Sequence, residues 1–119
     1  MENTIRSTFL HERLEAYAFA RKFYRSARVI REQLPRGLGE VRDQLYRAAS
    51  SISLAIAEEA NASQPKIKNL HFTRALASAG ECAAALDQIE DECAAPAVLL
   101  ATARDELHRC MRLTLGLRR

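Results

Sequence analysis

The sequence predicts an all-α fold, an antiparallel up-down-up-down four-helix bundle. Only four glycines and three prolines interrupt the 119 residues, and good helix formers such as alanine, leucine, arginine and glutamate dominate the segments between them. In those segments apolar residues recur at steps of three and four, which is the period of an amphipathic helix. Four such segments joined by short connections favour neighbouring helices that run in opposite directions.

The first two periodic segments are separated by a short turn. Pro35 disfavours helical geometry in the residue before it, so we expect the first helix to end near Leu34. Its apolar stripe is Leu10, Leu14, Tyr17, Ala20, Tyr24, Ala27, Ile30 and Leu34. The stripe of the second helix is Leu38, Val41, Leu45, Ala48, Ile52 and Ala55. The second helix should end at the polar cap and loop formers of residues 61–64.

The third helix is expected to begin at Pro65, a residue type that suits the first helical turn, and to run to about Glu92. It has two apolar sides, and both should be buried inside the bundle or an assembly. One side carries Ile67, Leu70, Ala77, Gly80 and Ala84, and the other carries Phe72, Leu76, Ala79, Ala83, Leu86 and Ile89. Because glycine lowers helix stability by about 1 kcal/mol relative to alanine, Gly80 indicates a close helix or subunit contact.

The fourth helix follows Pro96, which either ends the third helix or opens the fourth. Its stripe is Leu100, Ala103, Leu107, Cys110, Thr114 and Leu117. Residues 1–8 lack this periodicity, so we expect a flexible N-terminus followed by one bundle domain over residues 9–119.

The cysteine pattern and hydropathy predict a cytoplasmic protein without a membrane partner. Cys82, Cys93 and Cys110 are odd in number and lie in apolar helical patterns, so we interpret them as small core residues in a reducing compartment. No apolar stretch approaches the roughly 18 residues that a membrane span needs.

The charge distribution makes nucleic acid a plausible partner. The formal net charge is +3. Residues 1–47 hold ten basic and six acidic residues, residues 48–97 hold three and seven, and residues 98–119 hold five and two. The basic excess therefore lies at the two ends of the chain, where it can attract phosphates.

Arginines at helical spacing in the first helix form the strongest charged feature. Arg21, Arg25 and Arg28 are neighbours on the surface of a helix. The candidate nucleic-acid contacts are Arg21, Lys22, Arg25, Arg28 and Arg31, with Arg42, Arg47, Arg109 and Arg112 as extensions. A solvated helix face with salt bridges to partner helices explains the same pattern. No interleaving of basic and aromatic residues is clear enough to indicate a platform for single strands.

Two segments resemble a known family. Residues 43–63 read DQLYRAASSISLAIAEEANAS, and residues 69–92 read NLHFTRALASAGECAAALDQIEDE. Together they resemble the four-helix bundle family of the 23S rRNA-intervening-sequence proteins. The matching positions are Gln44, Arg47, Ala48, Ser51, Ile52, Ile56, Ala57, Glu58, Ala75, Ser78 and Glu81. The departures are Tyr46 for an arginine, Ser53 for a proline, Ala55 for an asparagine, and Glu59 and Ala77 for glycines.

The resemblance implies an assembly more than an activity. Relatives of this family include the accessory variability protein of diversity-generating retroelements. Members form rings of five four-helix protomers with a basic surface associated with nucleic acid. By resemblance we expect a homopentamer that associates with RNA or DNA, with a reverse transcriptase as a possible kind of protein partner.

The motif residues are expected to be structural. They are Ser51, Ile52, Ile56, Glu58, Ser78 and Glu81. A buried arginine such as Arg47, paired with a glutamate, would set the register between helices or subunits. Asp105 and His108 form the only acid-x-x-His pair, too few ligands for a di-iron bundle, so we predict no metal, no cofactor and no catalytic residue.

Three hypotheses about function follow. The first is a non-enzymatic oligomer that presents arginines to nucleic acid, and the alternative is a structural protein-protein interaction scaffold that does not bind nucleic acid. The third, an enzyme that uses Glu58 or Glu81, would require a pocket that gathers carboxylates with perturbed pKa values.

Overall fold

The computed structural model describes residues 9–116, apart from the side chains of Glu12 and Arg13, and this range contains four α-helices and no strand. The helices are α2 (Glu15–Gln33), α3 (Gly39–Asn61), α4 (Pro65–Asp91) and α5 (Ala97–Gly116). Two short 3-10 helices, η1 (Leu10–Arg13) and η2 (Arg36–Leu38), precede α2 and α3. The all-α prediction and the four predicted helices are confirmed. The predicted flexible segment over residues 1–8 and the predicted stripe residue Leu117 lie outside the described residues.

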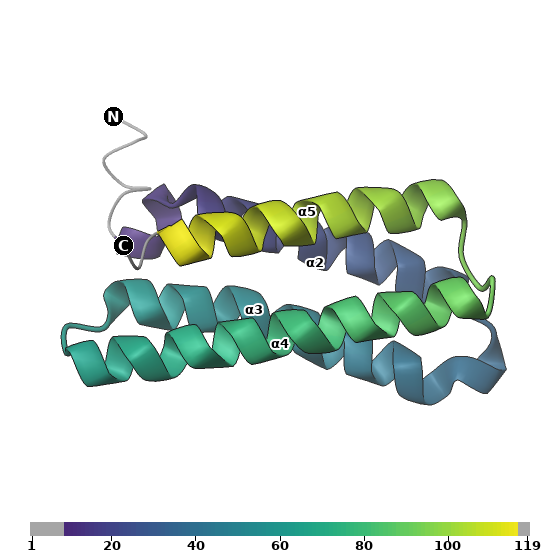
Figure 1. The fold of residues 1–119 in the computed structure, drawn as a ribbon, viewed down its shortest axis with the longest axis horizontal. Coiled ribbons are helices and arrows are strands. Elements are labelled where there is room, and N and C mark those ends of the chain that lie inside the picture. The colour runs from purple at the N-terminus through teal and green to yellow at the C-terminus, as the bar shows by residue number, and fades with distance from the viewer. Residues whose placement is uncertain (1–8, 117–119) are drawn as a thin grey trace.

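The four helices pack side by side along the long dimension of the molecule (Figure 1). The α3–α4 pair has the most extensive contact, followed by α2–α5 and α2–α3, and the contact between α4 and α5 is smaller. The connections from α2 to α3 and from α4 to α5 lie at one end of the molecule, and the connection from α3 to α4 lies at the other (Figure 1).

Helix boundaries follow from the residues that interrupt the pattern. Leu34 adopts an extended conformation before Pro35, which ends α2 as predicted. Pro65 is the first residue of α4, where its missing amide hydrogen is tolerated. Pro96 opens the fourth helix, because its carbonyl accepts hydrogen bonds from the amides of Leu99 and Leu100.

Most of the core comes from the predicted stripes of α2, α3 and α5, with a shift in α2, and the predicted stripe residue Leu10 is exposed in η1. The largest fully buried side chains are Phe23, Ile30, Leu45, Ile52, Ile56, Leu86, Ile89, Thr114, Cys82 and Cys110. In α2 the buried aromatic residue is Phe23, whereas Tyr17 and Tyr24 are only partly buried. The stripe is therefore rotated away from the two tyrosines, which leaves Tyr24 at the surface.

The prediction that α4 buries two apolar sides is wrong for the single chain. Every residue on the first predicted side is exposed, namely Ile67, Leu70, Ala77, Gly80 and Ala84. The buried stripe of α4 is Ala75, Ser78, Ala79, Cys82, Ala85, Leu86 and Ile89. A Cβ atom added at Gly80 would meet nothing within 4 Å, so no other helix of the described chain closely approaches this position.

The three cysteines do not share one environment. Cys82 and Cys110 are buried as predicted, and burial raises the pKa of these thiols to about 12 and about 11. Cys93 is exposed in the turn that follows α4, where its backbone adopts a φ of 52°. The prediction that Cys93 is a core residue is therefore wrong, because α4 ends two residues before it.

None of the helices between residues 9 and 116 is long and apolar enough to span a bilayer.

Candidate nucleic-acid interface

Four cations are exposed along the outer side of α2. We call Arg21, Lys22, Arg25 and Arg28 the α2 basic face. The burial of Ala20, Phe23 and Ala27 against the core turns the intervening positions toward solvent. The two acidic residues of α2, Glu15 and Glu32, lie near its ends. At 1.5 Å per residue, Arg21 and Arg28 are about 10 Å apart along the helix axis.

The ion pairs of the described chain do not include the α2 basic face, although the Glu106 carboxylate lies against α2, where it accepts a hydrogen bond from Ser26. None of its four cations forms an ion pair with a described side chain. The described ion pairs of arginine instead involve Arg74, Arg104 and Arg109. For these four residues, the alternative of salt bridges to partner helices therefore finds no support in the described chain.

The other predicted contacts divide into different roles. Arg42 donates hydrogen bonds to the carbonyls of Leu34 and Pro35, at 2.9 and 3.4 Å, and so caps the end of α2. Arg47 is exposed on α3. Arg42 is therefore less available to a phosphate than the cations of the α2 basic face, because its guanidinium already bonds to the backbone.

Aromatic and basic side chains also meet between α2 and α5. The Lys22 ammonium lies 4.5 Å from the centroid of the Phe19 ring, and the Arg109 guanidinium lies 5.8 Å from it. Arg109 also pairs with Asp105 at 3.0 Å. Phe19 lines an open hollow of about 290 Å³ together with Glu15, Arg109, Arg112 and Leu113. These contacts place Arg109 and Arg112 on the α5 side of the α2 basic face.

Sequence reasoning missed an aromatic and basic group on the α3 side of the same face. We call Tyr24, Arg31 and Tyr46 the Tyr46 cluster. The Arg31 guanidinium lies 4.3 Å from the centroid of the Tyr46 ring, and the Tyr24 and Tyr46 rings are 5.9 Å apart. A side-chain hydrogen bond to Tyr46 raises the pKa of Tyr24. The spacing of Tyr24 and Arg31 by seven residues was the available signal, because it places both on one side of α2.

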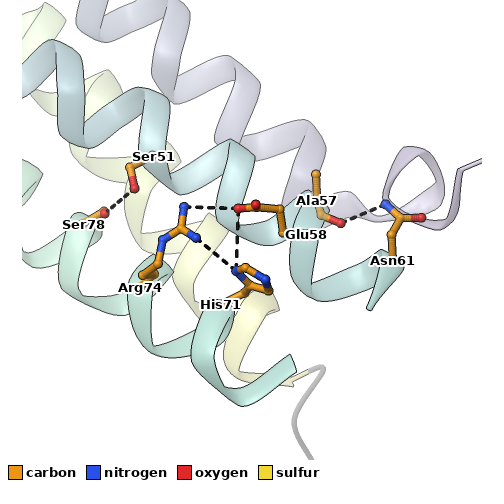
Figure 2. Close-up of polar contacts among 7 residues, drawn as sticks. All are labelled: Ser51, Ala57, Glu58, Asn61, His71, Arg74 and Ser78. Carbon is orange, nitrogen blue, oxygen red and sulfur yellow. Dashed lines mark hydrogen bonds and ion pairs between the residues drawn. The ribbon is translucent and has the colours of Figure 1, made fainter. Parts of the chain in front are cut away.

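Three of the motif residues, Ser51 and Glu58 of α3 and Ser78 of α4, make contacts between these two helices (Figure 2). The Ser78 hydroxyl donates a hydrogen bond to the Ser51 hydroxyl at 2.9 Å. Glu58 pairs with Arg74 at 3.1 Å and lies 3.6 Å from His71. Glu58 comes after Ser51 in α3, whereas its partner Arg74 comes before Ser78 in α4 (Figure 2).

The expected pairing of a buried Arg47 with a glutamate is wrong. Arg47 and Glu81 are both exposed, and the arginine that binds Glu58 is Arg74. Glu58 and Arg74 are each nearly half exposed, so their ion pair contributes at most about 1 kcal/mol to stability. Ile52 and Ile56 are buried, as a structural role requires. Ser51 and Ser78 thus form the shared polar contact that the motif supplies at this interface.

Asn61 is the last residue of α3, and its side chain contacts η1, the segment before α2. Its side-chain amide nitrogen donates to the Ala57 carbonyl at 2.8 Å (Figure 2) and lies 2.7 Å from Nδ1 of His11. The side-chain oxygen Oδ1 of Asn61 accepts a hydrogen bond from the backbone amide of Leu10 at 3.2 Å. These contacts hold η1 against the end of α3.

The described side chains bring together no group of three or more histidine, cysteine or acidic residues that could hold a metal ion. Asp105 and Glu106 lie beside His108 in the sequence, but Asp105 pairs with Arg109 and Glu106 accepts a hydrogen bond from Ser26 at 2.6 Å.

The chain matches no protein-family model, no curated protein and no solved structure.

Proposed function

We propose that this chain is a non-enzymatic, oligomeric protein that binds nucleic acid through the α2 basic face. The proposed architecture is an antiparallel up-down-up-down bundle in which α2 presents one side to solvent along its length. The observation that carries the proposal is the set of four exposed cations on α2, which have no ion-pair partner among the described side chains.

Unpaired surface cations favour phosphate binding for a physical reason. Each Lys or Arg that neutralises a phosphate releases condensed counterions, which gives affinity that is independent of sequence and weakens with salt. A cation that already has a carboxylate partner gains less from a phosphate. The α2 basic face therefore favours phosphate more than Arg74, Arg104 or Arg109, each of which has such a partner.

The assembly part of the proposal rests on the resemblance to the 23S rRNA-intervening-sequence proteins. We propose a homopentamer, in which several copies of α2 would extend the basic surface. RNA and DNA are both proposed ligands, and a reverse transcriptase is a proposed kind of protein partner. The exposed apolar side of α4, with Ile67 and Leu70, supports self-association in general.

A second candidate function is a protein-protein interaction scaffold that does not bind nucleic acid. The observation that favours it is the exposed apolar surface of α3 and α4, where Leu54 is 58% and Leu70 is 55% exposed. Such side chains on two adjacent helices fit a protein partner or another copy of the chain. Under this candidate, the cations of α2 serve only to solvate the surface.

The two candidates are separated by binding measured across a salt series. We would titrate the purified protein against labelled structured RNA and duplex DNA, and measure its mass by light scattering in the same samples. The variant carries Arg21→Ala, Arg25→Ala and Arg28→Ala. A charge-matched control carries Arg36→Ala, Lys66→Ala and Arg74→Ala, which removes three cations outside the α2 basic face.

The nucleic-acid proposal expects salt-sensitive binding that the α2 variant loses and the control variant keeps. Equal losses in both variants would show that only net charge matters, which contradicts a specific surface. A well-formed oligomer that binds nothing at low salt would leave the scaffold as the function.

A further inference from the structure

The Tyr46 cluster joins side chains from two helices at the surface. Arg31 of α2 lies with its guanidinium 4.3 Å from the centroid of the Tyr46 ring of α3. The Tyr24 ring of α2 is tilted against the Tyr46 ring, with 5.9 Å between the two ring centroids and an interplanar angle of 46°. Tyr46 is still 39% exposed, so the cluster is open to a ligand.

The cluster adjoins the α2 basic face. Arg28 precedes Arg31 by three residues, which is about 4.5 Å along the helix axis and nearly one turn. Arg28 and Arg31 both act on the Tyr24 hydroxyl electrostatically and oppose the rise in its pKa. A strand whose phosphates follow Arg21, Arg25 and Arg28 therefore passes beside the aromatic rings.

The chemistry of the cluster suits a base more than a phosphate. A planar guanidinium and an aromatic ring are the two kinds of surface on which unstacked bases stack in proteins. The exposed carboxylate of Asp43 precedes Tyr46 by three residues, which is nearly one turn of α3, and it disfavours a phosphate at this position.

We propose that the Tyr46 cluster stacks an unpaired base, so that the chain prefers single-stranded nucleic acid, or unpaired segments of structured RNA, over continuous duplex. This inference rests on the proposed nucleic-acid function and names its ligand class. The bases of a duplex are stacked on each other and present only their edges, so a duplex reaches the cations of α2 but not the stacking surface.

The test compares three labelled ligands of equal length in fluorescence anisotropy titrations. They are a mixed-sequence single strand, the same strand in a duplex, and an abasic single strand that keeps its phosphates. The protein variants are the full chain with Tyr46→Ala, with Tyr46→Phe, and with Arg21→Ala, Arg25→Ala and Arg28→Ala together. Thermal melts by circular dichroism check that each variant is folded.

The stacking proposal expects Tyr46→Ala to weaken binding of the single strand by roughly 5- to 150-fold, the range for loss of one stacked base. Tyr46→Phe should restore most of that affinity, because it keeps the ring. Binding of the duplex and of the abasic strand should be unchanged by Tyr46→Ala, whereas the triple variant should weaken binding of all three ligands.

Two outcomes overturn the inference in distinguishable ways. If Tyr46→Ala leaves single-strand binding unchanged, or weakens duplex and abasic binding as much, the cluster stacks no base, but the proposed function survives as long as the triple variant still weakens binding. If the wild-type chain binds none of the three ligands at low salt, the proposed function fails and the inference fails with it.

Discussion

The salt dependence of binding gives a quantitative prediction for the α2 basic face. If its four exposed cations each neutralise one phosphate of a single strand, log Kd should rise with log salt with a slope of about 2.8, at roughly 0.7 per contact. Raising the salt from about 50 to about 200 mM should then weaken binding about 50-fold. Replacing Arg21, Arg25 and Arg28 with alanine leaves Lys22, so the slope should fall to about 0.7 and the loss to about threefold.

Fluorescence anisotropy titrations at four salt concentrations would measure both slopes. The variant that removes Arg36, Lys66 and Arg74 is the control, and it should keep a slope of about 2.8 because its three cations lie outside the α2 basic face. A triple α2 variant that binds with an unchanged slope would refute the reasoning, because the phosphates would then be neutralised elsewhere. A slope that falls equally in the control would refute it too.

Two further predictions test the fold and the thiol environments. Cys93 should react with a thiol reagent near pH 8 in the folded protein, whereas Cys82 and Cys110, whose pKa values burial raises to about 12 and about 11, should react only after unfolding; rapid modification of all three thiols without denaturant would contradict the described burial. Ile52→Ala should lower the free energy of unfolding by about 2–5 kcal/mol in urea denaturation, because Ile52 is fully buried. Leu54→Ala on the exposed side of the same helix should change it by less than about 0.5 kcal/mol, and equal losses for the two variants would place the core of α3 elsewhere.

Much of the fold was predictable because three of the helices have a single apolar stripe. In α5 the described residues of the predicted stripe are all buried, and in α3 the stripe is buried from Leu45 onward. Leu38, which lies in η2, and Val41 are only partly buried, and Leu117 lies outside the described residues. In α2 the buried stripe is rotated around the helix relative to the predicted one. Tyr24 and Phe23 both have large apolar rings, and periodicity alone does not decide which one faces the core. Packing against α3 and α5 decides it in favour of Phe23.

The buried side of α4 was not predictable in the same way. Alanines and other small or apolar residues occupy positions on most sides of α4 itself. Two different stripes therefore fit the helical period equally well. The structure buries Ala75, Cys82 and Ile89, and leaves Ile67 and Leu70 exposed. A second copy of the chain would explain the apolar character of that exposed side, which is consistent with the proposed oligomer.

The sequence predicted the basic residues of the candidate interface but not the aromatic residue Tyr46 beside them. The exposure of Arg21, Arg25 and Arg28 follows from helical spacing, because buried residues occupy the opposite side of α2. The approach of Tyr46 to Arg31 depends on how α2 packs against α3, so no local pattern contains it. Likewise, the hydrogen bonds that Arg42 donates to the Leu34 and Pro35 carbonyls depend on the turn between these helices.

The measurement that tests the central claim most directly is a titration of the purified wild-type chain with labelled structured RNA at about 50 mM salt, with its mass fixed by light scattering in the same sample. The account predicts an oligomer that binds the RNA and releases it as the salt is raised. An intact oligomer that shows no binding at this salt concentration would contradict the account, and the chain would then be an interaction scaffold whose α2 cations only solvate its surface.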